Sequence, residues 1–321
     1  MSPAGGMTYR ASGVDLESAR RHTENIARFV GGGVKGFASV VPLPEGMQDP
    51  LLVSCTDGIG TKLLLALDMG RVDGLGQDLV AMSVNDLACT GARPLFFLDY
   101  LAVGRLDPDV AGRIVEGVAA ACQASGCTLV GGETAELPGL YAPSHFDLAG
   151  FAVGVVERAD LWGPHLVRAG DVIVGVPSSG IHSNGFSLVR ALVRDGHLAA
   201  TPDLVTPTRL YPAEVGRLRG ARVAVHSAAH ITGGGLPENL PRAVPEGLRP
   251  VLYRDAWGLP PALAAVLATE VVTPEEAWAT FNMGLGFCLV VPEQSVDATC
   301  ALIDDARPVG FVEGGDGLRV V

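Results

Sequence analysis

Short apolar runs alternate with amphipathic stretches along the first half of the chain. Four segments have the length and composition of strands, at 51–55, 94–104, 127–139 and 151–157. A continuous apolar run bounded by turn residues predicts a strand. We expect the first of these strands to be buried, and the third to break into a turn at its pair of glycines.

Two helices are predicted between these strands. The segment 78–91 has Asp78 as a possible N-cap and Gly91 as a possible end. The segment 107–126 has Asp107 as cap, proline in its first turn and Gly126 at its exit; its apolar face is formed by Val110, Ile114 and Val118.

The second half repeats this alternation. A strand at 171–180 leads into a helix at 186–196, and a glycine-rich stretch at 230–242 precedes a strand-like run at 281–291. Strands alternating with helices in both halves indicate α/β architecture with mixed sheets. We expect an N-terminal segment over 1–36, a first α/β domain over 37–167 and a second over 168–321.

Composition narrows the class of protein. The 321 residues are 48% hydrophobic, so each domain can bury a core. A net charge of −12 argues against a nucleic-acid surface, which needs clustered Lys and Arg. No signal peptide or apolar stretch long enough to span a bilayer is seen. The six cysteines form no C-x-x-C pair, so we expect reduced thiols and a cytoplasmic protein without membrane partners.

Only two of the 23 basic residues are lysines, Lys35 and Lys62, and both lie among glycines. Because lysine is a compact point charge, this context suggests tight anion sites, although two surface lysines retained by chance would look the same. Lys62 ends the stretch "TDGIGTK" (56–62), whose glycines are too close together for a Walker phosphate loop.

Four carboxylates interrupt apolar structure in the first half: Asp57, Asp86, Asp99 and Glu133. A buried carboxylate is costly unless it is paired or bound to metal, and a single one is equally explained as a cap or a core ion pair. Four of them, with Asp57 and Glu133 expected at the carboxyl ends of strands, favour a site where Mg²⁺ and phosphate meet. In that interpretation Asp57 holds metal while Thr61 and Lys62 face phosphate.

Other common motifs are absent. No complete dinucleotide fingerprint, nucleophile elbow or H-E-x-x-H zinc motif occurs. His182 and His230 are the two histidines in glycine-rich turns. A lone histidine is more often structural, but one in a flexible loop is a better candidate for substrate contact.

Taken in order, the motifs resemble one family. "YRASGVD", "SCTDGIGTKLLLALD", "VNDL", "PLFFLDY", "LVGGETAELPG", "SSGIHSNGFSLVR", "TPTRLY", "HITGGGLPENLPR" and "FNMGLG" are similar to the phosphoribosylformylglycinamidine cyclo-ligases (aminoimidazole ribonucleotide synthetases) of purine biosynthesis. The resemblance runs from Tyr9 to the C-terminus. It implies two α/β domains, with the N-terminal sheets of two protomers joining into a barrel across a homodimer.

The resemblance also implies a reaction and its residues. Formylglycinamidine ribonucleotide and ATP, with Mg²⁺, would yield aminoimidazole ribonucleotide, ADP and phosphate. The implied metal ligands are Asp57, Asp86 and Glu133. The implied ATP and phosphate contacts are Gly31, Gly32, Gly33 and Lys35 in a mobile covering loop (31–36), with Gly58, Gly60, Thr61, Lys62, Asp86 and Gly132. The implied substrate contacts are His182, Ser183 and Asn184, and Lys62, His182 and Asp57 are the catalytic candidates.

Three alternatives stay open at this point. A selenophosphate synthetase would carry a reactive Cys or selenocysteine near the early glycine loop, where this chain has none. A thiamine-monophosphate kinase would share the acidic motifs but not the combination of "HSNGFSLVR" with "HITGGGLPENLPR". A non-catalytic nucleotide-binding scaffold would be favoured by loss of the acids or lysines, and all are present.

Overall fold

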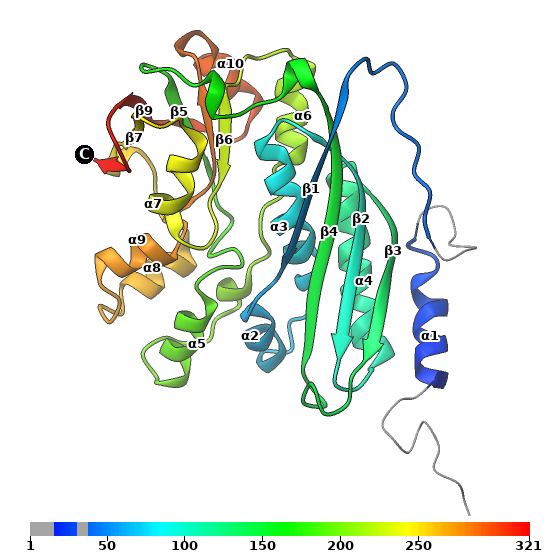
Figure 1. Ribbon diagram of the computed structural model, residues 1–321. Helices are drawn as coiled ribbons and strands as arrows, with labels where there is room; N and C mark the ends of the chain where they lie inside the picture. Colours follow the sequence, from blue (N-terminus) through cyan, green and yellow to red (C-terminus); the bar gives the residue numbers. More distant parts are fainter. Residues whose placement is uncertain (1–15, 31–37) are drawn as a thin grey trace, which may run out of the picture.

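The computed structural model describes residues 16–30 and 38–321 (Figure 1). The covering loop expected over 31–36, with Gly31, Gly32, Gly33 and Lys35, lies outside the described residues. In the described part, no helix has both the length and the apolar character needed to cross a membrane.

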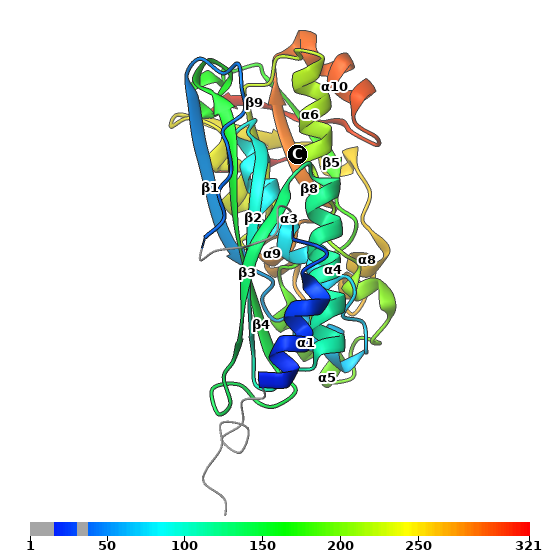
Figure 2. The same cartoon turned by 90° about the vertical axis from the view of Figure 1, so that its right-hand side faces the viewer.

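The first domain is a four-stranded mixed sheet with helices on one side. The strand order is β1-β4-β2-β3; β2 and β3 are parallel and the other pairs antiparallel. Its strands are β1 (Pro50–Gly58), β2 (Arg93–Val103), β3 (Thr128–Glu136) and β4 (Phe146–Glu157). Its helices are α1 (Leu16–Ile26), α2 (Lys62–Asp68), α3 (Leu75–Cys89) and α4 (Pro108–Ala124). Figure 2 shows α3 and α4 on one face of the sheet and the other face uncovered.

Two strand predictions needed correction. β1 is an edge strand rather than a buried one: its residues alternate in exposure, and the Leu52 side chain is 62% exposed on the uncovered face. β3 does not break at its glycines, because Gly131 and Gly132 stay paired with Leu98 and Asp99 of β2. The backbone hydrogen bonds of the parallel pairing with β2 keep the two glycines in the strand, although glycine itself does not favour an extended strand.

The helix predictions were better. Asp107 caps α4 as expected, accepting hydrogen bonds from the backbone N–H groups of Asp109 and Val110. The φ of +73° at Gly91 lets the chain leave α3 in a left-handed turn. The expectation that Asp78 caps α3 was wrong, because the helix begins at Leu75 and Asp78 lies inside it, fully buried.

The second domain is a six-stranded mixed sheet of order β10-β7-β9-β5-β8-β6. Only β10 and β7 are parallel neighbours. Its strands are β5 (Val172–Pro177), β6 (Ser227–His230), β7 (Leu248–Leu252), β8 (Leu285–Val291), β9 (Arg307–Gly314) and β10 (Arg319–Val320). Its helices are α5 (Phe186–Arg194), α6 (Pro212–Gly220), α7 (Gly235–Asn239), α8 (Pro261–Leu267), α9 (Pro274–Thr280) and α10 (Val296–Leu302).

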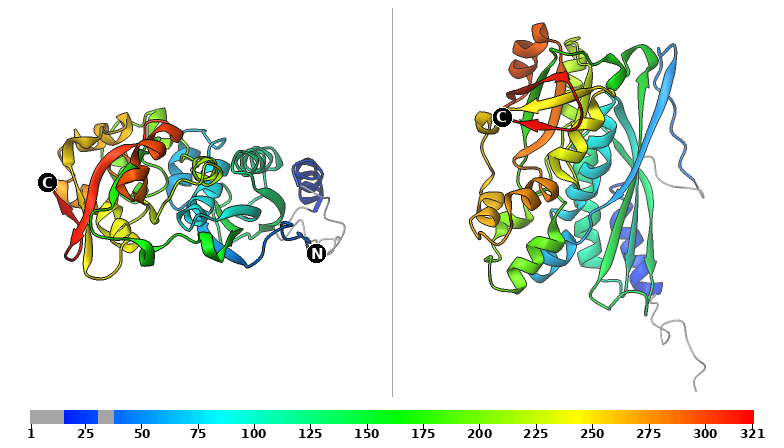
Figure 3. Two further views of the ribbon diagram at one scale, coloured as in Figure 1. Left: turned by 90° about the horizontal axis from the view of Figure 1, so that it is seen from above. Right: turned by 60° about the vertical axis from the view of Figure 1, so that its left-hand side comes forward.

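Helix α3 lies between the two domains. It packs against β1, β2 and β4 of its own sheet on one side and against β6 and α6 of the second domain on the other. Figure 3 shows this arrangement from two further directions. Nearly all of its side chains are buried, as expected for a helix covered from both sides. Groups on α3 are therefore shared between the domains.

Candidate active site

Two acids of the first domain and a histidine of the second meet beside α3. Asp57 lies near the end of β1, Asp86 on α3 and His230 at the end of β6. The Nδ1 atom of His230 is 2.9 Å from Asp86 Oδ1, and the imidazole is 1% exposed while the carboxylate is 43% exposed. His230 is thus an internal support that leaves the rest of Asp86 open to solvent.

Asp57 belongs to the same cluster. Partial burial raises the pKa of its carboxyl and the nearby charge of Asp86 raises it further, whereas the hydrogen bond from Gly58 N–H lowers it. Two carboxylates this close repel each other unless a cation or proton lies between them. The pair therefore has the charge arrangement of a cation site.

A cavity of about 270 Å³ opens on this cluster. Asp86 and His230 line it together with Thr232, Asn239 and Arg242 of the glycine-rich stretch. The Asn239 amide donates to the carbonyls of that stretch and so fixes its turn. The cavity presents a carboxylate and a guanidinium together, which suits an anionic ligand held partly through a cation.

Within one chain Glu133 does not join the two acids. Asp57 is paired with Gly150, Gly150 with Asp99, and Asp99 with Gly132, which puts these four positions in one row across the sheet. Successive side chains of a strand point to opposite faces, so Glu133 points away from the face that carries Asp57. In the described ranges no three His, Cys, Asp or Glu side chains are grouped as a metal site. Asp57 and Asp86 alone still fit Mg²⁺, which commonly takes one or two carboxylates and completes its shell with water and phosphate oxygens.

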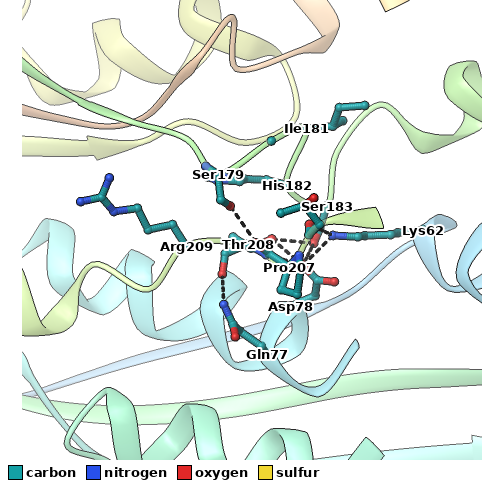
Figure 4. A network of polar contacts seen from close by, with 12 residues as sticks. Lys62, Gln77, Asp78, Ser179, Ile181, His182, Ser183, Pro207, Thr208 and Arg209 are labelled. Atoms are coloured by element: carbon teal, nitrogen blue, oxygen red, sulfur yellow. Dashed lines mark hydrogen bonds and ion pairs between the residues drawn. The ribbon is translucent and has the colours of Figure 1, made fainter. Parts of the chain in front are cut away.

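The expectation that Lys62 faces phosphate is contradicted by its position. Its side chain is fully buried, with Nζ 2.8 Å from Asp78 Oδ1 and 2.7 Å from the carbonyl oxygen of Thr206 (Figure 4). Burial lowers the pKa of Lys62, and Asp78 offsets part of that effect. Lys62 starts α2, and from there its side chain enters the space between α3 and the second domain.

The glycine turn before Lys62 does lie beside the acids. Gly60 is exposed with a φ of +60°, and Thr61 Oγ1 is 3.2 Å from Ser187 Oγ of the second domain. Gly58 has only 3.0 Å of space between a hypothetical Cβ and the carbonyl of Leu148. Gly58, Gly60 and Thr61 are thus adjacent to Asp57, and their phosphate contacts stay predictions.

The predicted substrate residues are mostly internal. His182 is 1% exposed; its Nε2 accepts from Ser179 N–H, and burial holds the pKa of the ring well below its usual value. Ser183 is buried and donates to Asp78. Both side chains are enclosed, although the buried Nδ1 of His182 has no hydrogen-bond partner in the described part of the chain. Contact of His182 and Ser183 with substrate stays a prediction. Asn184 is half-buried and lies against Gly233 of the glycine-rich turn.

A second cavity, of about 410 Å³, lies between α1 and β3, and Gly132 and Asp99 line it. Burial raises the pKa of Asp99 to about 7. Asp99 Oδ1 occupies the space that a Cβ at position 132 would need, since the two would be 2.1 Å apart. His22 of α1 also lines the cavity, and its buried Nδ1 has no hydrogen-bond partner in the described part of the chain.

Sequence reasoning left the roles of His230 and Asp99 open and missed His22, Asp78 and Arg242. The sequence did mark His230, because it lies in a glycine-rich turn. His22 is surrounded by charged residues that predict only an exposed helix face, so no signal in the sequence marked it.

Comparison with known proteins agrees with this architecture. Residues 38–156 match the family described as AIR synthase related protein, N-terminal domain, and residues 168–321 match the corresponding C-terminal domain. The chain is 44% identical to the phosphoribosylformylglycinamidine cyclo-ligase of Parasynechococcus marenigrum (strain WH8102) and 48% identical to that of Myxococcus xanthus (strain DK1622), in each case over 97% of both chains.

Solved structures share the fold at much lower identity. The thiamine-monophosphate kinase from Stenotrophomonas maltophilia K279a superposes with a TM-score of 0.67 at 20% identity, over 95% of this chain and 94% of the kinase. The hydrogenase maturation protein HypE in complex with ATP superposes with a TM-score of 0.70 at 17% identity, over 92% and 86%. With two α/β domains in this arrangement, both halves matched, and near full-length relatives above 40% identity, the chain belongs to the AIR synthase related family.

Proposed function

We propose that this enzyme cyclises formylglycinamidine ribonucleotide to aminoimidazole ribonucleotide, with ATP converted to ADP and phosphate, in purine biosynthesis. The observation that carries the proposal is the Asp57–Asp86 pair, supported by His230, at the junction of the two domains. The full-length relatives named as this cyclo-ligase support the choice of reaction over that of the kinase and HypE, which are similar in fold alone.

The proposed reaction requires that an amide oxygen be converted into a good leaving group. The formyl oxygen attacks the γ-phosphorus of ATP and ADP leaves; a nitrogen of the substrate then attacks the formyl carbon. The C–N bond closes the ring, the oxygen leaves as phosphate, and the nitrogen loses its proton. Well-oriented intramolecular attack can reach effective molarities of ~10⁵ M or more, so positioning supplies much of the acceleration and no protein nucleophile is required.

Four side chains at the domain junction have roles in the proposed reaction. Asp57 and Asp86 would hold Mg²⁺, which when bound neutralises charge on the phosphates. His230 orients Asp86, and Arg242 supplies the positive charge that the buried Lys62 does not bring to the cavity. Lys35 remains a predicted ATP contact outside the described residues.

The cavity under α1 is proposed to take the base of ATP. Its walls are mostly apolar, and it offers two polar groups to a planar ring: the Asp99 carboxyl, and the Nδ1 of His22, which has no partner within residues 16–30 and 38–321. Pockets with apolar walls and a few convergent polar groups suit such ligands. Gly132 lines this cavity, in keeping with its predicted role as an ATP contact.

The enzyme is further proposed to be a cytoplasmic homodimer. The uncovered sheet face exposes Leu52, Tyr100 and Phe151, which suits burial against a second copy, and Glu133 lies on that same face. A second copy could thereby bring its glutamate to the acids of the first. The six cysteines carry no disulfide, as is usual for reduced compartments. The net charge of −12 gives nucleic acid no basic surface.

An isotope experiment tests the central step. With ¹⁸O in the formyl oxygen of the substrate, we expect the label in the released inorganic phosphate, measured by mass spectrometry. Incubation without ATP controls for exchange of the label with water. Label that leaves in water during turnover, with unlabelled phosphate, would exclude phosphorylation of the formyl oxygen.

A further inference from the structure

Lys62 and Asp78 form an ion pair that solvent does not reach. Both side chains are 0% exposed, and the two charged atoms are 2.8 Å apart (Figure 4). Removing two charges from water is costly, and apolar residues of similar size at such positions are often no less stable. Stability alone therefore gives little reason for this pair.

The other partners of the pair all come from the second domain. Asp78 Oδ1 accepts from Thr208 N–H at 2.8 Å, from the Thr208 hydroxyl at 2.6 Å and from the Ser183 hydroxyl at 3.2 Å. Lys62 Nζ donates to the carbonyl of Thr206 at 2.7 Å. Asp78 Oδ2 has no hydrogen-bond partner in the described part of the chain. Apart from the bond from Lys62, the hydrogen bonds that support the buried Asp78 carboxylate therefore come from these groups of the second domain.

Segment 206–211 is bonded to the first domain along its length. In each case a side chain of α2 or α3 contacts a backbone group of the segment: Lys62 the carbonyl of Thr206, Asp78 the N–H and Gln77 the carbonyl of Thr208, and Asn85 both the carbonyl of Arg209 and the N–H of Tyr211. Because these contacts are made to backbone groups, they do not depend on the side chains of the segment, and they fix the position of the segment on the first domain.

The same helix leads from this pair to the candidate active site. Asp78 and Asp86 are two turns apart on α3, roughly 12 Å along its axis. Asn85 donates to the segment and lies 3.4 Å from His230 Nε2, while Asp86 contacts His230 Nδ1. Any shift of the second domain along α3 would therefore move His230 relative to Asp86.

We propose that Lys62 and Asp78 are positioning residues, whose buried pair holds segment 206–211 on α3 and thereby holds His230 against Asp86. They touch no substrate. The inference rests on the proposed function only for its turnover assay, because the arrangement of the segment can be measured without any substrate.

The primary test uses Thr208→Val, which nearly keeps the volume of the side chain and removes the hydroxyl that donates to Asp78 and lies 3.1 Å from the Ser183 hydroxyl. We expect kcat to fall by about tenfold, the loss of one charge-assisted hydrogen bond, with the KM for ATP within about twofold of wild type. Hydrogen exchange over 206–211 should rise by about tenfold, with β1 to β4 unchanged. Asp73→Asn, which removes an exposed ion pair with Arg113 just before α3, should change none of these values.

A double-mutant cycle separates positioning from direct catalysis. Lys62→Met and Asp78→Leu should each lower kcat by about a hundredfold, and the double variant should lose no more than about twofold beyond the worse single change, because the pair acts as a unit. The exchange measurement on Thr208→Val decides the matter if either single variant fails to fold.

Two results would overturn the proposal. A raised KM for ATP in Lys62→Met, with Asp78→Leu and Thr208→Val normal, would make Lys62 a nucleotide contact. Unchanged exchange over 206–211 in Thr208→Val would show that the pair does not hold the segment. Absence of turnover in the wild-type enzyme would refute the proposed function instead, and the exchange measurement would still decide the positioning role.

Discussion

Asp99 is a carboxylic acid whose burial disfavours its charged form. Its pKa is raised by burial from 3.8 to about 7, so the folded protein holds this proton over a range where the unfolded chain has lost it. The unfolded state binds fewer protons between these two values, and stability therefore falls as the pH rises from about 4 to about 7.

Asp99→Asn should remove that dependence. We expect the variant to gain up to about 4 kcal/mol in free energy of unfolding above pH 7, the equivalent of three pKa units, and to gain nothing below pH 4. Urea unfolding at several pH values measures the difference. Asp109→Asn, at an exposed carboxylate of α4, is the control, and a gain at Asp99 that does not vary with pH would contradict the stated cause.

At the scale of single residues, the sequence predicts which side chains lie near one another better than it predicts what each side chain does. Asp57 and Asp86 come together as expected because strand ends and helix faces follow from the pattern. Lys62 and His182 sit in equally suggestive glycine contexts, yet both are internal. What decides their role is a contact with residues more than a hundred positions away, such as Thr206 for Lys62, and no local pattern records such a contact.

At the scale of single elements, local rules explain most of what is seen. Helix α4 has its cap and its first-turn proline where the sequence predicts them, and Ile114 and Val118 of the predicted face are buried, whereas Val110 is half-buried. β1 differs, because an apolar run does not tell whether both faces of a strand are covered. β3 differs because its partner β2 supplies the pairing that its glycines disfavour.

The α4 cap offers a test that separates stability from activity. Asp107→Ala removes the acceptor for two backbone N–H groups at the start of the helix and should cost about 1 kcal/mol of unfolding free energy. Thermal or urea unfolding measures this loss. Because the cap lies outside the acid cluster, kcat should be unchanged, and Asp107→Asn should keep most of the stability. A loss of activity without loss of stability would mean that α4 has a direct part in the site.

At the scale of the whole molecule, the uncovered sheet face is the main feature that one chain leaves without an explanation. Leu52→Glu would place a charge in the proposed dimer interface, where burying it unpaired is strongly unfavourable. We expect light scattering to show monomers at concentrations where the wild type is dimeric, and turnover to fall with the dimer. Val271→Glu changes an equally apolar exposed site of the second domain and should leave the mass unchanged. A fully active monomer would contradict the shared site.

Helix α3 has a further consequence for how the chain is made. Its second-domain side presents Gln77, Asp78, Asn85 and Asp86, whose partners over 206–211 and at His230 are synthesised more than a hundred residues later. At ribosomal speeds this leaves the helix half-covered for roughly 6 to 25 s. An apolar face would be exposed to aggregation throughout that wait, whereas amides and carboxylates are hydrated by water until the later segment replaces it. The polar side of α3 thus lets the first half of the nascent chain avoid aggregation until the second half has been synthesised.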